Sequence, residues 1–547
     1  MNRSDRAEVM RLARDRLGFA GLRPAQTEAI EALLDGHDVL SVMPTGSGKS
    51  AIYQIAAMLL DGPTVVVSPL IALQQDQLAG IEAAELAGAA AVNSTLRAGE
   101  RRAAFDRLEG GSLEFLFLAP EQFASADTMD RLAAAPPSLF VVDEAHCISE
   151  WGHDFRPDYV RLGAVIGSLG RPRVLALTAT AAPEVRDEIV QRLGMRRPRV
   201  MVRGFERPNI RPAVERCTDD ASRRKAIVAA ARAARRPGIV YAATRRAVEE
   251  IAAALGEAGI AAGFYHAGMK ADDRARVQED FMAGRFEVLA ATNAFGMGVD
   301  KADVRFVFHA GPPDSPEAYY QEFGRAGRDG GPADAVLFYR PEDIGVRRAM
   351  SGVARFKTAE VERVAEALAD RAAPADAGEL AEETELPEGR IERVLNRLAD
   401  VGAAEVLAGG GAVAENHIDP GAAAEDAVAE QERHRRFRSG RLEIVRDYAE
   451  TRACRWNHLL NHFGEPTAGP CGHCDNCEAG TAEAAAAEQT DPSLPFPLKS
   501  RVRHRVFGDG TVMRYEADKV VVLFDTEGYH SLVTGYVLEH DLLEPAE

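Results

Sequence analysis

The chain has 547 residues, of which 46% are hydrophobic, and a formal net charge of −19 at neutral pH. This length and hydrophobic content allow several separate cores, which excludes a chain that is disordered throughout. The acidic average does not exclude a nucleic acid partner, because phosphate binding depends on local clusters of Lys and Arg. The start, MNRSDRAEVMRLARDR, is too charged for a signal peptide, and no apolar run reaches the roughly 18 residues of a membrane span. We therefore expect a cytoplasmic protein without a membrane partner.

Short apolar runs alternate with helical or loop segments over the first 205 residues. The runs that we predict to be buried strands are 37–43, 64–68, 115–119, 139–142 and 174–178. Continuous apolar strands separated by helical segments are typical of a parallel sheet that is covered on both faces. The pattern predicts an α/β lobe over residues 1–205.

The first predicted strand leads into MPTGSGKS, residues 43–50, and then into an apolar helix. Strand, glycine-rich loop and helix in this order predict a phosphate-binding loop, in which Gly46 and Gly48 let backbone N–H groups surround phosphates. Lys49 would reach the β- and γ-phosphates, and Ser50 would hold Mg²⁺. The predicted nucleotide-binding residues of this loop are Thr45, Gly46, Ser47, Gly48, Lys49 and Ser50.

Two carboxylates, Asp143 and Glu144, follow the apolar run 139–142. The carboxyl ends of parallel strands meet at one edge of an open α/β sheet, and ligands bind there. We expect Asp143 to anchor the metal ion and Glu144 to orient and deprotonate the attacking water. Ordinary surface acids are the alternative, and the phosphate loop at the same sheet edge argues against it.

A second α/β lobe is predicted over residues 206–345. Its predicted strands are the apolar runs 238–244, 261–268, 286–292, 304–310 and 335–340. The segment YYQEFGRAGRDG, residues 319–330, places Arg325 and Arg328 three positions apart, on one face if it is helical. An arginine opposite the phosphate loop would stabilise the charge on the transferred γ-phosphoryl group, whereas the alternative is a solvated pair.

The pattern changes after residue 345. Within 346–421, a short helix, a turn, an amphipathic helix and a Gly-rich hairpin predict a winged helix, and a plain helical connector is the alternative. Residues 479–493 are rich in Pro and Ala and are predicted to be a linker. Residues 494–547 alternate short apolar runs with Gly turns, which predicts a small β-barrel.

Four of the six cysteines crowd into a short part of the predicted helical region 422–478. Their spacing is C-x16-C-x2-C-x2-C, formed by Cys454, Cys471, Cys474 and Cys477. Four thiolates fill the tetrahedral shell of Zn²⁺ and leave no position for a water, so we predict a structural zinc. The other two cysteines are interpreted as ordinary thiols.

An ordered set of motifs resembles that of superfamily 2 helicases: MPTGSGKS at 43–50, DEAH at 143–146, LTATA at 177–181, ATNAFGMGVDKADVRFVFH at 291–309 and QEFGRAGRDG at 321–330. Three further stretches are similar to the RecQ family of DNA helicases in particular: LGFAGLRPAQTEAI at 17–30, SPLIALQQDQ at 68–77 and HCISEWGHDFRPDY at 146–159. The resemblance covers about residues 10–345, and the cysteine module with CRWNHLLNHFGE extends it.

The resemblance implies two tandem RecA-like lobes that use ATP and Mg²⁺ to translocate 3′ to 5′ on DNA and to unwind duplexes in recombination and repair. It implies that Phe19, Arg23 and Gln26 hold the adenine and that Asp300 also belongs to the nucleotide site. The catalytic residues that it implies are Lys49, Asp143, Glu144, Gln321, Arg325 and Arg328. The implied substrates are single-stranded and branched DNA, which would place the protein at the nucleoid.

By the same resemblance, the segment after the acidic pair is an aromatic-rich loop that senses single-stranded DNA. The implied DNA contacts are Ser68, Trp151, His153, Phe155 and Arg156. A base stacked on an aromatic ring contributes about 1–3 kcal/mol. Separating one stacked base-pair step costs about 1.4 kcal/mol, so unwinding must be coupled to hydrolysis. The alternative is an aromatic loop packed permanently against the second lobe.

The end of the chain, including VRHRVFGDGTV, resembles the Tudor-like terminal domain of the UvrD and PcrA helicases, which implies a docking module for a protein partner. The predicted winged helix precedes the zinc module, whereas the RecQ family usually has the opposite order. Its predicted tip, LAGGGA at 407–412, has no aromatic residue to stack on a terminal base pair. Two other functions stay open: a superfamily 2 RNA helicase, and a DNA-binding regulator that uses ATP as a switch without unwinding.

Overall fold

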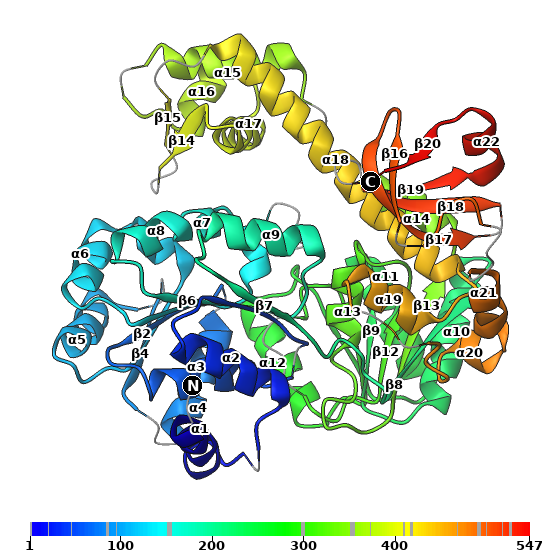
Figure 1. Cartoon of the computed structure of the whole chain (residues 1–547), viewed down its shortest axis with the longest axis horizontal. Coiled ribbons are helices and arrows are strands. Elements are labelled where there is room, and N and C mark those ends of the chain that lie inside the picture. The colour runs from blue at the N-terminus through cyan, green and yellow to red at the C-terminus, as the bar shows by residue number, and fades with distance from the viewer. Residues whose placement is uncertain are drawn as a thin grey trace. The chain divides into compact units, whose positions relative to one another are not determined.

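Figure 1 shows the computed structural model of the chain, coloured from the N-terminus to the C-terminus. It describes residues 3–19, 21–44, 46–69, 71–83, 87–93, 96–149, 156–296, 301–350, 356–371, 373–407, 411–415, 419–465, 467, 469–489, 494–498, 500–516, 518–524 and 528–546. Two compact units are present: the first joins Met1–Ile344 with Ile444–Ser493, and the second joins Gly345–Glu443 with Leu494–Glu547. Among the described helices, none combines the length and the apolar character that crossing a bilayer requires.

The first unit begins with a seven-stranded sheet in which all paired strands run parallel. Its strands are β1 (Val39–Val42), β2 (Thr64–Val67), β3 (Ala89–Val92), β4 (Phe115–Leu118), β5 (Leu139–Val142), β6 (Arg173–Thr178) and β7 (Arg199–Val202). Their spatial order is β3-β4-β2-β5-β6-β1-β7. The strands predicted from apolar runs are the five inner ones, and the two edge strands were missed because β3 is Ala-rich and β7 is half exposed.

The second sheet of this unit is also parallel and has six strands. Its strands are β8 (Ile210–Arg216), β9 (Gly238–Tyr241), β10 (Ala262–Tyr265), β11 (Val288–Ala291), β12 (Phe306–His309) and β13 (Ala333–Tyr339). Their order is β10-β11-β9-β12-β13-β8. Again the missed strand, β8, lies at the edge, where charged and polar residues interrupt the apolar pattern.

Helices flank both sheets, as the prediction of two α/β lobes requires. Those that accompany the first sheet are α1 (Arg3–Asp15), α2 (Pro24–Leu34), α3 (Ser50–Ala57), α4 (Ile71–Ala83), α5 (Ala98–Glu109), η1 (Pro120–Ala124), α6 (Ala126–Ala134), η2 (Ala145–Ile148), α7 (Pro157–Val160), α8 (Leu162–Ser168) and α9 (Pro183–Arg192). Those of the second sheet are α10 (Asp220–Ala233), α11 (Arg245–Glu257), α12 (Ala271–Met282) and α13 (Pro316–Phe323). The inner strands are buried on both faces, so the two sheets form rigid supports for the loops at their carboxyl ends.

The segment that follows has the element order of a winged helix. After α14 (Glu342–Met350) come α15 (Thr358–Ala369), α16 (Ala377–Thr384), α17 (Glu388–Asp400), β14 (Ala404–Val406) and β15 (Ala412–Ala414). An isolated antiparallel bridge joins Ala375 to Ala412 of this two-stranded hairpin. The apolar faces of the three helices share one core, which includes Val361, Leu368, Leu380, Ile391, Val394 and Leu398. Residues 408–410 of the predicted tip lie outside the described residues.

A long helix, α18 (Pro420–Glu450), leads to the cysteine-bearing module. That module contains α19 (Arg455–His462), α20 (Asp475–Glu478) and α21 (Thr481–Gln489). The helix α21 corrects part of the predicted linker 479–493. Its sequence, TAEAAAAEQ, consists largely of Ala and Glu, which have high helix propensity, and the prediction gave too much weight to composition.

The end of the chain forms a five-stranded antiparallel sheet. Its elements are β16 (Arg501–His504), β17 (Gly508–Glu516), β18 (Lys519–Phe524), β19 (Gly528–Val533), α22 (Thr534–Glu539) and β20 (Leu543–Pro545). The order β19-β18-β17-β16-β20 describes an open half-barrel rather than a closed ring. A bulge between Val512 and Arg514 bends β17, and the concave side holds a small apolar core that includes Phe496, Val502, Val520 and Phe524.

Candidate active site and zinc centre

The predicted phosphate loop lies between β1 and α3, as the motif requires. Gly46 and Gly48 both have φ of +77°, a left-handed conformation that glycine adopts without strain. A Cβ atom added to Gly48 would lie 2.7 Å from Nε2 of Gln26, so a larger residue there would displace Gln26. The Nζ of Lys49 donates a 3.0 Å hydrogen bond to the carbonyl of Met43, at the opposite end of the loop. Ser47 is buried, Ser50 begins α3, and Thr45 lies outside the described residues.

The acidic pair follows β5 directly. Glu144 has φ of +47°, a conformation that costs energy in a residue with a side chain and that concentrates at functional sites. Its backbone N–H donates a 3.0 Å hydrogen bond to Oδ1 of Asp143. Burial, and then the adjacent Glu144 carboxylate, raise the pKa of Asp143 to about 7. Two desolvated carboxylates side by side favour a cation between them.

Positive groups converge on the same place. Burial lowers the pKa of Lys49. The carboxylates of Glu144 and Asp143 partly offset this by raising the pKa, whereas the positive charge of Arg328 lowers it further. Paired acids, a lysine and glycine N–H groups therefore form the donor set that suits a nucleotide phosphate with its Mg²⁺. When bound, Mg²⁺ would neutralise phosphate charge, with Ser50 and Asp143 as the residues that hold it.

The acidic pair is connected to the neighbouring strand end through His146. Its Nδ1 lies 2.9 Å from Oγ1 of Thr178, within hydrogen-bond distance, and 3.3 Å from Oε2 of Glu144. Thr178 belongs to LTATA, and its hydroxyl also donates a 3.1 Å hydrogen bond to the carbonyl of Thr180. Glu144 is thus linked to the end of β6, through contacts that sequence reasoning did not identify.

The two predicted arginines have different surroundings. Arg328 packs against the phosphate loop, since its Cγ would lie 3.5 Å from a Cβ atom at Gly46. Arg325 is 5% exposed and lies near Tyr241. Burial raises the pKa of Tyr241 to about 12, and the positive charge of Arg325 opposes that rise. The prediction that both lie on one helical face is wrong, because α13 ends at Phe323 and the chain continues in turns.

The structure describes one of the two other predicted site residues of the second lobe. Gln321 lies on α13 and is half-buried, and Asp300 lies outside the described residues. The turns that carry the arginines begin at Gly324 and include Gly327, which has φ of +56°. Such backbone geometry suits glycine and prevents helix continuation.

The predicted adenine residues lie around the start of α2. Oε1 of Gln26 accepts a 2.8 Å hydrogen bond from the backbone N–H of Arg23, and its Nε2 donates to the carbonyl of Gly48 at 2.8 Å. Gln26 therefore supports the phosphate loop directly. Phe19 is 39% exposed and Arg23 is exposed, which leaves both side chains accessible to a ligand.

The aromatic-rich segment is described only at its two ends, because Trp151, His153 and Phe155 lie outside the described residues. On its C-terminal side, the buried Tyr159 donates a 3.0 Å hydrogen bond from its hydroxyl to the carbonyl of Asp143. Tyr159 was not among the predicted residues, although it ends the stretch HCISEWGHDFRPDY.

Arg156 fixes the same segment to two other places. Its backbone N–H donates to the carbonyl of Cys147 at 2.9 Å, and its Nη1 donates to the carbonyl of Pro69 at 2.9 Å. The neighbouring Ser68 is buried, and its carbonyl accepts a 3.0 Å hydrogen bond from Nε2 of Gln74. The predicted DNA contacts Ser68 and Arg156 are therefore brought together beside the acidic turn.

The four predicted cysteines converge at one place. Their sulfur atoms all lie within 4.8 Å of one another, with Cys454 and Cys474 buried. Hydrogen bonds from the Cys454 and Cys471 thiols, together with the backbone N–H groups of Arg455 and Cys477, lower the pKa of Cys474. Backbone donors to sulfur are what thiolates bound to a metal require, so the cluster fits a structural Zn²⁺.

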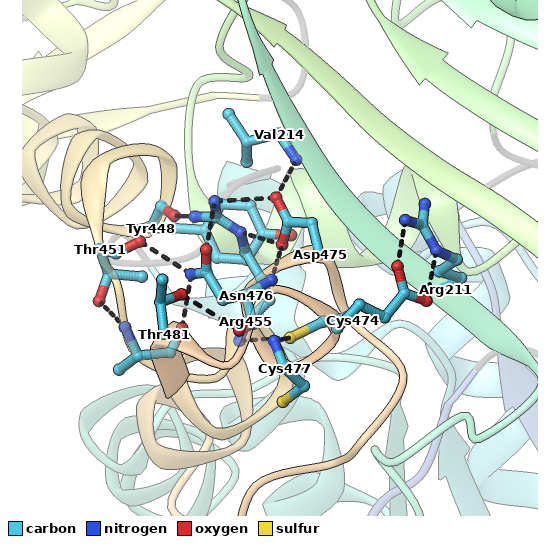
Figure 2. A network of polar contacts seen from close by, with 12 residues as sticks. Arg211, Val214, Tyr448, Thr451, Arg455, Cys474, Asp475, Asn476, Cys477 and Thr481 are labelled. Atoms are coloured by element: carbon cyan, nitrogen blue, oxygen red, sulfur yellow. Dashed lines mark hydrogen bonds and ion pairs between the residues drawn. The ribbon is translucent and has the colours of Figure 1, made fainter. Parts of the chain in front are cut away.

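Figure 2 shows the polar network that supports this cluster. Arg455 donates to both oxygens of Asp475, at 2.9 and 3.0 Å. Asp475 in turn accepts a 2.9 Å hydrogen bond from the backbone N–H of Val214 on β8. Arg211, on the same strand, binds Glu478. The zinc module is thereby attached to the edge of the second sheet.

Three family profiles match the chain. Residues 23–189 match the DEAD/DEAH box helicase family, residues 223–330 match the helicase conserved C-terminal domain, and residues 414–478 match the RecQ zinc-binding domain.

Two relatives and one solved structure extend these matches. The chain is 40% identical to the "Probable ATP-dependent DNA helicase RecS" of Bacillus subtilis over 358 residues, which cover 65% of this chain and 72% of that protein. It is 35% identical to the "ATP-dependent DNA helicase RecQ" of Haemophilus influenzae over 460 residues, which cover 84% of this chain and 62% of that protein. A crystal structure of the DUF1998 helicase MrfA bound to DNA and AMPPNP superposes with a TM-score of 0.52 at 19% identity, over 76% of this chain and 62% of that one. This last likeness concerns the fold alone.

The two parallel lobes, the phosphate loop and the acidic pair define an ATP-dependent helicase of the two-lobed class. Identity to the two bacterial helicases over most of this chain, together with the RecQ zinc-binding match, identifies one family within this class. The chain belongs to the RecQ family of ATP-dependent DNA helicases.

We expect Lys49→Ala to reduce ATP turnover by on the order of 100-fold, because a positioned positive group at the γ-phosphate would be lost. Binding of an oligonucleotide, measured by fluorescence anisotropy, should stay close to wild type. Lys225→Ala, which removes an exposed lysine from α10, is the matched control. Unchanged turnover in the Lys49 variant would contradict the site.

Purified protein should contain about one zinc atom per chain, and Cys474→Ser should abolish it, because three thiolates leave the tetrahedral shell incomplete. Elemental analysis by mass spectrometry measures this content. Cys217→Ser, outside the cluster, should keep its zinc. Metal retained in the Cys474 variant would refute the ligand set.

Proposed function

We propose that the chain couples ATP hydrolysis to 3′ to 5′ movement along single-stranded DNA and to separation of duplex strands. The observation that carries this proposal is the hydrogen bond from the Tyr159 hydroxyl to the carbonyl of Asp143. It joins the end of the aromatic-rich segment to the backbone of the residue assigned to the metal.

The coupling has a short physical route. A base stacked on Trp151 or Phe155 would bias the position of the segment that ends in Arg156 and Tyr159. Because Tyr159 is buried and bonded to Asp143, a shift of that segment would move the acidic turn. Glu144 already holds a strained backbone conformation, so a small movement can change how it orients the water.

We assign roles to the site residues on this basis. Lys49 and Arg328 would stabilise the charge that develops on the γ-phosphoryl oxygens, since both adjoin the phosphate loop. Glu144 would act as the general base. Arg325 and Gln321 would position the second lobe relative to the nucleotide, and Asp300 would contact the nucleotide. Phe19, Arg23 and Gln26 would hold the adenine.

We propose branched DNA as a substrate in addition to single strands, at the nucleoid in the cytoplasm. The winged-helix segment is not assigned to the duplex, because the exposed residues of α16 and α17 include Glu382, Glu388 and Glu392, which would repel phosphates. The half-barrel of residues 494–547 would instead dock a protein partner.

A strand-displacement assay tests the proposal directly. We expect unwinding of a DNA duplex with a 3′ single-stranded tail and none with a 5′ tail, because movement in one direction must begin on the tail. A matching RNA duplex should not be unwound. Efficient unwinding of RNA would favour the RNA helicase alternative, and ATP turnover without any unwinding would favour an ATP-switched regulator.

Tyr159→Phe removes only the hydroxyl that bonds to Asp143. We expect the stimulation of ATP turnover by single-stranded DNA to fall several-fold while turnover without DNA changes little, as measured by phosphate release. Trp151→Ala should have the same effect. Tyr536→Phe, an exposed tyrosine on α22, serves as the control. Equal losses of basal and stimulated turnover would defeat the coupling.

A further inference from the structure

The linker between the two lobes, residues 203–209, joins β7 to β8 and begins beside the phosphate loop. The backbone N–H of Arg203 donates a 3.3 Å hydrogen bond to the carbonyl of Val42, the last residue of β1. A Cβ atom on Gly204 would lie 3.7 Å from Cδ of Pro44, within the loop itself. Gly204 has φ of +83°, so glycine is the residue that turns the chain there without strain.

The other end of the linker holds the turn that carries the arginines. Nη2 of Arg207 donates to the carbonyls of Ala326 and Gly327 at 3.0 and 2.9 Å. Nδ2 of Asn209 also donates to the carbonyl of Gly327, at 2.8 Å. Arg328 directly follows these acceptors. The linker is therefore bonded at one end to the last residue of β1, directly before the phosphate loop, and at the other to the backbone that presents Arg328.

The zinc module binds the linker near the end that adjoins the phosphate loop. The carboxylate of Glu465 accepts hydrogen bonds from the backbone N–H of Gly204, at 3.1 Å, and of Phe205, at 2.9 Å. The ring of Phe463 stacks on that of Phe205 with a centroid distance of 4.5 Å and an interplanar angle of 1°. The hydroxyl of Tyr320, on α13, donates to the carbonyl of Phe205 at 2.7 Å.

The turn after α19 also reaches the first lobe. Arg186, on α9, donates from Nε to the carbonyl of Ala181 at 2.9 Å and from Nη2 to the carbonyl of Phe463. Ala181 is the last residue of LTATA, so one guanidinium joins the zinc module to the strand end that contacts His146.

Other contacts of the zinc module go to the second lobe. Nε1 of Trp456 donates to the carbonyl of Ile210 at 3.2 Å, and Nε2 of His462 lies 2.8 Å from Oε1 of Glu317. These contacts attach the module to one lobe. The Glu465 carboxylate differs from them because its two partners are backbone groups of the linker, at the end nearest the phosphate loop.

We infer that Glu465 is a positioning residue for ATP hydrolysis, which acts by fixing the linker so that Arg328 and the phosphate loop meet in the productive geometry. The inference rests on the proposed function, since it assigns a further residue to the same reaction. Glu465 is not among the residues assigned to the nucleotide, and the partners of its carboxylate are the N–H groups of Gly204 and Phe205. Its carboxylate accepts from two successive N–H groups with separate oxygens, an arrangement that a carboxamide cannot reproduce because it has only one acceptor oxygen.

Glu465→Gln is the decisive variant, assayed in the full-length protein with Mg²⁺, ATP and a single-stranded oligonucleotide. Since misplacing a catalytic group by a fraction of an ångström is costly, kcat should fall about tenfold. The KM for ATP should stay within about twofold, because the phosphate loop keeps its own contacts. Zinc content and melting temperature should match the wild type.

Glu478→Gln is the matched control. Glu478 also makes a paired carboxylate contact from the zinc module, but to the side chain of Arg211 on the second lobe. We expect its kcat to equal that of the wild type. A role that merely tethers the module would lower kcat to the same extent in both variants, and that result would overturn the inference.

Two further outcomes would also overturn it. One is wild-type kcat in Glu465→Gln. The other is a loss of kcat that follows a loss of zinc or of folded protein. Failure of the proposed function would give a different result. In that case, the ATP turnover of the wild-type protein itself would not respond to the oligonucleotide.

Discussion

The site depends on the burial of two adjacent carboxylates beside a lysine. Asp143 and Glu144 emerge from β5 into surroundings that raise the pKa of Asp143 to about 7, and Lys49 lies close enough to offset part of that cost. Charges in such surroundings interact strongly because little water screens them. Cations beside the pair therefore favour its ionised form, and Mg²⁺ bound with a nucleotide would supply such a charge.

Hydrogen bonds connect this acidic pair to neighbouring parts of the first lobe. His146 connects it to the end of β6, and Tyr159 connects it to the segment assigned to DNA. Residues 203–209, the linker between the lobes, connect the end of β1, next to the phosphate loop, to the turn that carries Arg328, and Glu465 of the zinc module binds that linker. The module whose cysteines fit a structural zinc is thus hydrogen-bonded to the linker that adjoins the phosphate loop.

The prediction of the fold succeeded for the inner strands of both sheets and for the edge strand β10, and it missed the other three edge strands. The inner strands of both sheets are mostly apolar runs, whereas the three missed edge strands, β3, β7 and β8, carry Ala, Arg or Pro in place of such a run. The helix α21 was assigned to a linker from its composition. The helical face predicted for Arg325 and Arg328 is interrupted because Gly324 and Gly327 end α13 in turns.

The sequence by itself determined the phosphate loop, the acidic pair and the four cysteines, because each is a local pattern whose chemistry follows from residue type and spacing. Only the tertiary structure decided which distant residues meet them. Phe205 and Glu465 are separated by 260 positions and are joined by one hydrogen bond. No local pattern predicts such a pair, since hydrogen-bond partners on separate elements are chosen by the packing of the elements that carry them.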